Sequence, residues 1–454
     1  MKKYDVVIIG GGPSGIITGV TGIKQNPDKS FLLINESEKG LVPCGIPYVF
    51  HDLDGVTENQ MGPKPFKNAG GEVLIDKVTS VDPSEKILET QDGEEIQYER
   101  LVFATGSRPT KPTFIEGYDL EGVEYIDKNY DYIDELHSQT KELDEIVIIG
   151  GGFIGLEVAE QLAKFEDKKI TIIEMEDHCL YNAFSPDFAE QATEAIQDAG
   201  VNILTGSKAK KITGENGQAN GVKLSNGDTV PADLIISAIG YTPNSEIAQE
   251  AGLEINKHGA IKVDNYLRTS EQDIFAAGDC AGTTGFITGR TDNIMLASTA
   301  TAEARVLGYN LCDIKLMRNF PGTLSVFSTE INNQAFASAG AIEQEAEEAK
   351  VAFVTGEFST KDRHPGAIKD ASTVTAKLTV SPENGEIIGG ELHGGKSVGE
   401  MINIISLAIQ KAVTVYELVS FQIGTHPLLT PAPTKYILIK AAEDAISKIK
   451  KNEN

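Results

Sequence analysis

The chain contains two copies of one unit, an apolar strand that runs directly into a glycine-rich turn. Residues 4–9 (YDVVII) precede the turn GGGPSG at 10–15, and residues 146–149 (IVII) precede GGGFIG at 150–155. Both turns fit the spacing G-x-G-x-x-G, whose glycines allow a tight turn, close approach of a pyrophosphate and packing of a helix on the strand. Near-continuous apolar strands are typical of a parallel sheet buried on both faces. The repeat therefore predicts an α/β chain with two Rossmann-like dinucleotide-binding domains.

The first unit carries the residues for one nucleotide. Its fingerprint and loop positions are Gly10, Gly12, Pro13, Ser14 and Gly15. The helix that follows offers its N-terminus to phosphate groups. The next strand, residues 31–34, ends at Asn35 and Glu36. One of these two side chains must occupy the strand tip and bind the ribose hydroxyls; we choose Glu36 and keep Asn35 as the alternative.

The second unit predicts a site for NADH. Its glycines are Gly150, Gly152 and Gly155, and its second strand, residues 170–173, ends at Glu174, the expected ribose-binding carboxylate. Met175, Glu176 and Asp177 follow. No arginine is present there to hold a 2′-phosphate, and the acidic side chains repel one, so NADPH is the less favoured cofactor.

Three residues of the second glycine turn and its helix are further candidates for the nucleotide site. Phe153 is placed to cover a flavin or nicotinamide face, with core packing as the equal alternative, and Ile154 is its neighbour in the turn. Glu157, one helical turn on, is directed toward the nicotinamide pocket or is an ordinary helix-surface residue.

Cys44, in the segment Leu41-Val42-Pro43-Cys44-Gly45-Ile46-Pro47-Tyr48, is the candidate redox nucleophile. The segment begins about ten residues after a strand, and its pattern predicts the first turn of a helix, where unpaired backbone N–H groups favour a thiolate. The alternative is a buried cysteine that acts as a small apolar residue. The two flanking nucleotide sites favour the redox interpretation.

Three more strands end in glycine turns and complete the pattern. Their turns contain Ala104-Thr105-Gly106, Ala238-Ile239-Gly240 and Ala277-Gly278-Asp279. In this order, and together with the two fingerprints, they resemble the FAD-dependent pyridine nucleotide-disulfide oxidoreductases. The resemblance covers about the first 330 residues, and the remainder is similar in length and pattern to that family's dimerisation domain.

The resemblance implies two cofactors and four segments. FAD occupies the first site and NADH the second. The segments are 1–113 and 245–325 for the FAD-binding domain, 114–244 for the NAD-binding domain, and 326–454 for a C-terminal α+β dimerisation domain. Asp279 binds the ribityl chain of FAD, and a helix from about Leu296 to Leu311 directs its N-terminus, near Leu296 and Ala297, at the flavin. The remaining implied FAD contacts are Pro43, Val78, Ala104, Thr105, Gly106 and Gly278, and Gly240 belongs to the NADH site.

The cysteine segment indicates one branch of that family. Position 49 is Val49, so the C-x-x-x-x-C pair of glutathione reductases is absent, and the segment resembles coenzyme A disulfide reductases, persulfide and polysulfide reductases, and NADH oxidases and peroxidases. Pro13 and Ser14 stand where NADH oxidases and peroxidases usually have a histidine. The tyrosines that coenzyme A disulfide reductases usually carry are replaced by the surroundings of His364 and His426.

The expected reaction is NADH-dependent reduction of a small disulfide, persulfide or polysulfide through FAD and Cys44, with coenzyme A as a candidate substrate group. Lys64 and Lys67 are candidates to meet its phosphates. Two alternatives stay open. One is reduction of oxygen or peroxide through a Cys44 sulfenic acid. The other is a flavoprotein reductase for a rubredoxin-like partner, in which Cys44 is incidental.

The C-terminal part predicts an antiparallel module with strands near 352–358, 373–380 and 387–392 and an amphipathic helix near 398–412. His426-Pro427 resembles the His-Pro pair that two-cysteine relatives lend to the partner subunit, which predicts a homodimer and a proton donor. A loop histidine satisfied by backbone is the alternative.

Composition narrows the partners and the compartment. The formal net charge is −27 over 454 residues, which argues against nucleic acid or an anionic membrane surface. The four cysteines, at 44, 179, 280 and 312, show neither C-x-x-C nor zinc-like spacing, so a reducing cytoplasm and no metal are expected. Neither a signal region nor an apolar run of bilayer length is found in the sequence.

Overall fold

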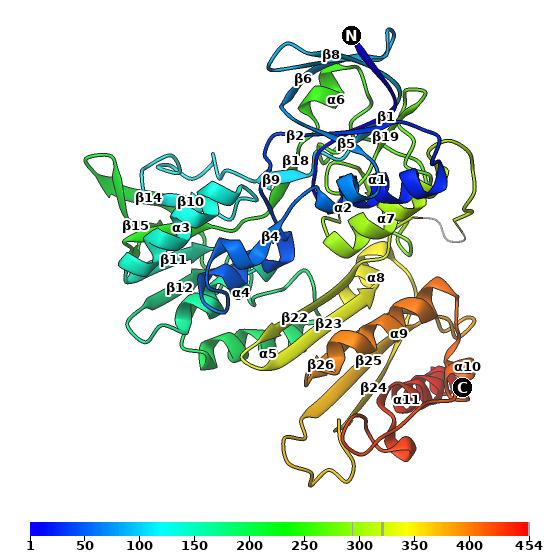
Figure 1. Cartoon of the computed structure of the whole chain (residues 1–454). Helices are drawn as coiled ribbons and strands as arrows, with labels where there is room; N and C mark the ends of the chain where they lie inside the picture. The colour runs from blue at the N-terminus through cyan, green and yellow to red at the C-terminus, as the bar shows by residue number, and fades with distance from the viewer. Residues whose placement is uncertain (293, 319–321, 453–454) are drawn as a thin grey trace.

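The first nucleotide-binding sheet is built around the buried strand β1 (Lys2–Ile9). The computed structural model describes residues 1–292, 294–318 and 322–452. Val6, Val7 and Ile8 have no exposed surface, as expected for a strand covered on both faces. The parallel part of the sheet has the order β5-β2-β1-β8-β19, with bounds Glu72–Ile75, Phe31–Asn35, Lys2–Ile9, Glu95–Phe103 and Ile274–Ala276. The last of these strands returns to the sheet after the second domain is complete (Figure 1).

Strand β8 pairs with β1 along nearly its whole length and has a different second neighbour at each end. Its C-terminal residues pair with β19, whereas its N-terminal residues pair antiparallel with β7 (Ile87–Thr90), which in turn pairs with β6 (Val78–Asp82). This arrangement carries Val78 to the edge of the pocket described below.

The second sheet is entirely parallel and repeats the first. Its order is β10-β17-β11-β12-β13, with bounds Val123–Tyr125, Leu234–Ser237, Glu145–Ile149, Lys169–Ile173 and Asn202–Leu204. Helices α3 (Tyr130–Glu142), α4 (Phe153–Ala163) and α5 (Pro186–Asp198) accompany it, and an antiparallel meander follows, β14-β15-β16, at Ala209–Glu215, Gln218–Leu224 and Thr229–Pro231.

The two crossings between these sheets pair with each other. Strand β9 (Ser107–Pro109) leaves the first sheet and β18 (Tyr241–Pro243) leaves the second, and they form an antiparallel ribbon. The ribbon is extended by main-chain bonds from Thr110 N to Gly240 O at 2.9 Å and from Asn244 N to Gly106 O at 2.9 Å.

Helices α1 (Pro13–Gln25) and α7 (Ala297–Asn310) pack side by side below the first sheet (Figure 1). Close contact requires glycine at Gly308, because a Cβ there would lie 2.6 Å from Thr21 Cβ. The N-termini of both helices lie at the same pocket, since Pro13 and Ala297 both line it. The predicted limits of α7, Leu296 and Leu311, differ from the observed limits by one residue at each end.

The C-terminal module is an antiparallel sheet, β22-β23-β26-β25-β24, at Val326–Ile331, Gln334–Gly340, Ile387–Gly394, Thr373–Val380 and Val354–Lys361. The first two strands were missing from the sequence prediction. They form a hairpin whose turn residues, Asn332 and Asn333, both have positive φ. The helices of this module are α8 (Glu343–Ala349), α9 (Val398–Gln410), α10 (Val415–Leu418) and α11 (Ile437–Asn452), of which only α9 was predicted as a complete helix.

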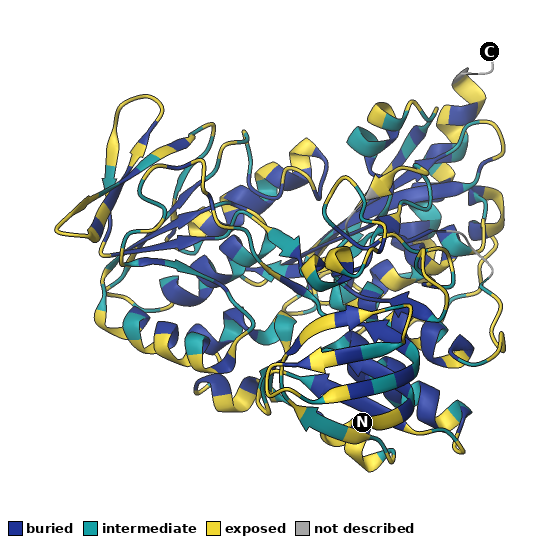
Figure 2. Cartoon of the chain, turned by 90° about the horizontal axis from the view of Figure 1, so that it is seen from above, coloured by how far each residue is buried: buried dark blue, intermediate teal, exposed yellow. Residues whose placement is uncertain are grey.

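The fold class predicted from sequence is confirmed, with two Rossmann-like units and a C-terminal α+β module. The segment limits 1–113, 114–244, 245–325 and 326–454 stay predictions, and residues 293, 319–321 and 453–454 within them lie outside the described residues. Each module has its own buried strands, with exposed residues on the outer helix faces and loops (Figure 2). Within the described ranges, no helix combines the length and the apolar character needed to span a bilayer.

Candidate active site

A large pocket, of about 1510 Å³, lies where the two nucleotide-binding sheets meet the C-terminal module. Most residues predicted for the site line it. They are Gly10, Gly12, Pro13, Ser14, Asn35, Glu36, Pro43, Cys44, Val78, Ala104, Thr105, Gly106, Gly150, Gly152, Phe153, Ile154, Glu157, Glu174, Gly240, Gly278, Asp279, Leu296 and Ala297. The predicted site residues that do not line it are Gly15, Gly155 and His426, together with the candidate phosphate-binding residues Lys64 and Lys67.

The outer glycines of each fingerprint shape the turn, and the middle one opens it. Gly10 has φ of +110°, and a Cβ added to Gly15 would lie 2.0 Å from the carbonyl oxygen of Gly10. Gly150 and Gly155 repeat both features, with φ of +111° and the same 2.0 Å approach. At Gly12 a Cβ would meet nothing within 4 Å, so this face of the turn is open to the pocket. Gly15 and Gly155 therefore act through backbone packing.

The two strand tips are related by register. Ile9 pairs with Ile34 and Ile149 with Ile173, so the residues that follow, Asn35 and Glu174, occupy the same position. Gly11 N donates to Asn35 Oδ1 at 2.8 Å, and Gly151 N donates to Glu174 Oε2 at 2.6 Å.

Glu36 lies one position beyond this tip. Its side chain is 68% exposed and pairs with Lys77 Nζ at 3.3 Å. The geometry favours Asn35 over Glu36 for the first ribose, and Glu174 keeps its predicted position at the second.

The part of the pocket beside the first glycine turn fits FAD, because hydrogen-bond donors there have no acceptor within the described part of the protein. Ser14 Oγ is buried without a hydrogen-bond partner in the described structure. It lies at the start of α1, where backbone N–H groups also await an acceptor. A pyrophosphate supplies acceptors for both. At the other end, Leu296 and Ala297 present the start of α7 to the pocket, where positive helix-end charge favours an electron-rich ring.

Cys44 is exposed to this pocket but does not begin an α-helix. It lies in a short 3₁₀ turn, Pro43–Gly45, followed by a second one, Pro47–Phe50, so the predicted helix is wrong. Loss of water around the side chain raises the pKa of the Cys44 thiol, and the carboxylates of Glu157 and Asp279 raise it further, whereas Lys128 lowers it. Burial and these neighbouring charges, and not the N-terminus of an α-helix, therefore determine how readily Cys44 forms a thiolate.

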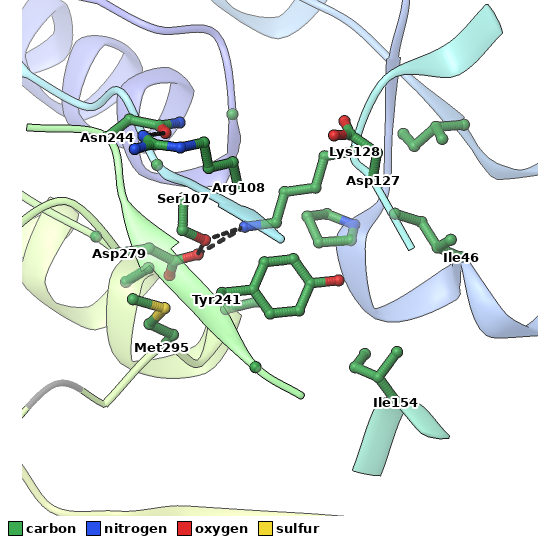
Figure 3. Close-up of a pocket in the computed structure, with 18 of the residues that line it drawn as sticks. Ile46, Ser107, Arg108, Asp127, Lys128, Ile154, Tyr241, Asn244, Asp279 and Met295 are labelled. Atoms are coloured by element: carbon green, nitrogen blue, oxygen red, sulfur yellow. Dashed lines mark hydrogen bonds and ion pairs between the residues drawn. The ribbon is translucent and has the colours of Figure 1, made fainter. Parts of the chain in front are cut away.

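Lys128, Ser107 and Tyr241 form a polar cluster in the pocket that sequence reasoning missed. Lys128 Nζ lies 2.7 Å from Asp279 Oδ2 and donates to Ser107 Oγ at 2.7 Å, and Ser107 Oγ donates to the same carboxylate oxygen at 2.7 Å (Figure 3). The ammonium lies 5.1 Å from the centre of the Tyr241 ring. These residues come from separate segments, and only their positions directly after strands gave a signal.

Glu157 is partly buried at the pocket wall. Thr329 Oγ1, from β22, donates to its Oε1 at 2.9 Å. Burial raises the pKa of the Glu157 carboxyl to about 7, with a further increase from Glu160. Glu157 is therefore a pocket residue, not a helix-surface residue, and it titrates near neutral pH.

Phe153 both lines the pocket and packs. Its ring centre lies 5.4 Å from that of Phe327 and 6.2 Å from that of Phe184. Phe184 belongs to the main core cluster, so this contact fixes the Phe153 ring at the pocket wall.

His426 lies in an exposed loop of the C-terminal module. Its Nδ1 accepts from Leu428 N at 3.2 Å, and Thr430 Oγ1 accepts from His426 N at 3.0 Å. The adjacent loop is joined to it, since His364 N donates to Pro427 O at 3.0 Å. Within one chain the histidine does not reach the pocket.

Of the four cysteines, Cys44 is the one found in the described pocket lining. Cys179 and Cys280 are buried, and Cys312 is partly exposed. All four are free. The site thus combines two nucleotide-binding turns with a single accessible thiol.

Comparison with known proteins agrees with this arrangement. Residues 4–304 match the model of the pyridine nucleotide-disulphide oxidoreductase family, and residues 327–436 match the dimerisation domain of that family. The chain is 29% identical to an NADH oxidase of Methanocaldococcus jannaschii, over 98% of this chain and 99% of that protein. It is 30% identical to an NAD(P)H sulfur oxidoreductase (CoA-dependent) of Pyrococcus abyssi, over 87% and 88%.

A solved structure has the same fold over nearly all of the chain. The NAD-dependent persulfide reductase from A. fulgidus superposes with a TM-score of 0.90 and 31% identity, covering 99% of this chain and 84% of that one. The chain belongs to the pyridine nucleotide-disulphide oxidoreductase family and is an NAD(P)H-dependent flavoprotein oxidoreductase that uses FAD.

Proposed function

We propose that this protein uses NADH to reduce a small disulfide, persulfide or polysulfide through Cys44. The observation that carries the proposal is the exposure of this thiol in the pocket that both glycine fingerprints line. The full-length likeness to a persulfide reductase and to a CoA-dependent sulfur oxidoreductase supports a sulfur substrate.

The proposed reaction uses one protein sulfur, that of Cys44. The Cys44 thiolate attacks the substrate RS–SR, forming a mixed disulfide and releasing RS⁻. When bound, FAD would supply two-electron transfer between NADH and the active-site sulfur. Two-electron reduction of the mixed disulfide frees the Cys44 thiolate and a second RS⁻. Two protons complete the two product thiols: one enters with the hydride of NADH, and one comes from solvent.

The chain's own residues divide the remaining work. Ser14, Asn35 and Asp279 would hold FAD, and Glu174 would hold the ribose of NADH. Lys128 favours the thiolate by its positive charge. Glu157 is partly buried in the wall of the same pocket, its pKa is raised to about 7, and it is the proton donor that this chain itself supplies.

The acidic rim beyond Glu174 favours NADH over NADPH. Glu174 is held by two main-chain donors, Gly151 N at 2.6 Å and Glu176 N at 2.8 Å, so its charge is fixed at the ribose position. Met175, which also lines the pocket, is 63% exposed and offers no cation to a 2′-phosphate.

A coenzyme A group is the proposed form of the substrate thiol. The CoA-dependent relative supports it. Lys64 and Lys67, on the short helix α2 (Lys64–Asn68), are exposed and lie outside the pocket lining, so any contact with a coenzyme A phosphate falls at the outer rim.

The active unit is proposed to be a homodimer. The dimerisation-domain match supports this. Large apolar side chains within five residues of His426 in the sequence are exposed, with Phe421 47%, Leu428 55% and Leu429 66% exposed. A second copy seated on this loop would bring its His426 to the first copy's pocket.

The test compares two cysteine variants. Anaerobic NADH oxidation with coenzyme A disulfide or polysulfide should fall to background in Cys44→Ser, while NADH oxidation with ferricyanide continues. Cys312→Ser is the matched control, a partly exposed cysteine outside the pocket, and should keep both activities. Sulfur reduction at the original rate by Cys44→Ser would refute the proposal.

Oxygen is the second candidate acceptor, because the relative that spans 98% of this chain is an NADH oxidase. In that case Cys44 would cycle through a sulfenic acid. Aerobic NADH consumption with no added sulfur compound, matched by the formation of water or peroxide, distinguishes the two.

A further inference from the structure

Glu303 is a buried carboxylate below the pocket with no role so far. It lies on α7 one turn after Ala300, which lines the pocket, and only 4% of its surface is exposed. A carboxylate is rarely buried without a structural or functional partner, because its desolvation is costly.

Its partners join two separate segments. Thr323 Oγ1 donates to Glu303 Oε1 at 3.1 Å, and the backbone of Gly278 lies near enough to the carboxylate to lower its pKa. Thr323 lies just before β22, where the chain enters the C-terminal module. Gly278 begins the turn that presents Asp279 to the pocket.

The Gly278 turn is tightly fitted. Its φ is +80°, and a Cβ there would lie 2.9 Å from Ser14 Cβ and 3.6 Å from Ala300 Cβ. The glycine is therefore clamped between the first fingerprint, the start of α7 and the Glu303 carboxylate. Movement of this carboxylate would displace both Asp279 and the surface that faces Ser14.

The charges around Glu303 make it sensitive to pH. Arg318, after α7, and Asp279, after β19, are the charged groups that face it, and α1 carries a single charged residue, Lys24, in its last turn. Burial raises the pKa of the Glu303 carboxyl to about 6, against the opposing effect of Arg318. Lys128 pairs with Asp279, so Arg318 is the cation that acts on the charge of Glu303.

We propose that Glu303 is a positioning residue for FAD: it fixes the Gly278–Asp279 turn, and its charge tunes the affinity and reduction potential of the flavin. The proposal depends on FAD binding and not on the identity of the sulfur or oxygen acceptor. A negative charge near the flavin disfavours added electrons, so the carboxylate lowers the potential.

The test measures FAD directly. In Glu303→Gln we expect the Kd for FAD to rise about tenfold, the scale of one hydrogen bond to a charged group. The midpoint potential, from spectroelectrochemistry, should shift to more positive values at pH 7.5 and converge with that of the unmodified protein at pH 5. Convergence is expected because, at pH 5, Glu303 of the unmodified protein is mostly protonated and therefore neutral, like the glutamine of the variant.

Glu391→Gln is the matched control, since Glu391 is also buried, at 1% exposure, but lies outside the described pocket lining. It should change neither FAD quantity. An unchanged Kd and potential in Glu303→Gln would overturn the proposal, and so would a potential offset that is equal at every pH. If Glu303→Gln does not fold, Thr323→Val decides: weaker FAD binding supports the proposal, and the original Kd overturns it.

Discussion

Lys128 Nζ and Asp279 Oδ2 lie 2.7 Å apart and join the two nucleotide-binding domains across the pocket. Lys128 precedes α3 of the second domain, and Asp279 follows β19 of the first. Both side chains are partly shielded, at 31% and 17% exposure, so the pair is stronger than one on the open surface. The same lysine acts on Cys44, which makes domain contact and thiol reactivity interdependent.

Lys128 and Glu157 carry opposite charges near Cys44, so removing each charge should shift the pKa of the Cys44 thiol in opposite directions. Lys128→Met should raise the thiol pKa, because it removes the cation that stabilises the thiolate, and Glu157→Gln should lower it, because it removes a repelling carboxylate. The rate of alkylation by iodoacetamide, followed against pH, measures both. Thiolate-dependent attack in Glu157→Gln would then reach its plateau at lower pH. Shifts of the same sign in the two variants would contradict this electrostatic account.

Cofactor preference should follow the second strand tip. The double variant Glu174→Gln, Met175→Arg removes a fixed negative charge and adds a cation beside the ribose. The ratio of kcat/KM for NADPH to that for NADH should rise by about tenfold or more, the worth of one charge-assisted phosphate contact. Glu36→Gln is the control, because Glu36 lies near the other nucleotide, and it should leave the ratio unchanged.

Register predicts which residue of the first strand tip matters. Asn35→Ala removes the acceptor of Gly11 N and should weaken FAD retention, measured by flavin loss on gel filtration. Glu36→Ala removes only an exposed ion pair with Lys77 and should retain FAD. If Glu36→Ala lost FAD and Asn35→Ala retained it, Glu36 would be the ribose ligand after all.

Glu391 predicts a pH-dependent stability change. Burial raises the pKa of this carboxyl to about 7, although Ser185 N donates to its Oε1 at 2.6 Å and Lys377 is near. A carboxyl whose pKa is raised by folding contributes stability below its unfolded pKa, and that contribution is lost as pH rises through the folded pKa. Glu391→Gln should therefore gain stability relative to the unmodified protein between pH 5 and pH 8, by about 2 kcal/mol. Urea unfolding at both pH values tests the sign.

The variant Leu429→Asp tests whether the exposed surface around His426 forms the dimer interface. This side chain is 66% exposed beside His426, and a carboxylate there should dissociate a dimer that uses the surface. Sedimentation should show a monomer with reduced sulfur reductase activity. Ile314→Asp, 62% exposed and outside the C-terminal module, should stay dimeric. Dimers of equal stability in both variants would place the interface elsewhere.

Sequence reasoning succeeded where steric rules act over short distances. The fingerprints were found because only glycine fits at Gly10 and Gly150, where positive φ and a nearby carbonyl leave no room for a side chain. The choice between Asn35 and Glu36 depended on strand register, which the local sequence does not reveal.

Other features required tertiary structure or a signal that was not used. Lys128, Ser107 and Tyr241 meet only because β9 and β18 pair, so their cluster could not be predicted from spacing. The β22–β23 hairpin did leave a signal, since Asn332-Asn333 is a dipeptide suited to positive φ at both positions. Its strand β23 was overlooked because small residues dominate QAFASAG.

The pairing of β9 with β18 has a mechanical consequence. Both links between the nucleotide-binding domains are locked to one another by main-chain bonds, so neither domain can hinge on a single flexible strand. The backbone therefore sets the separation between the two glycine-rich turns. Substitutions around Cys44 can therefore change which acceptor is reduced without changing the distance between the two nucleotide-binding domains.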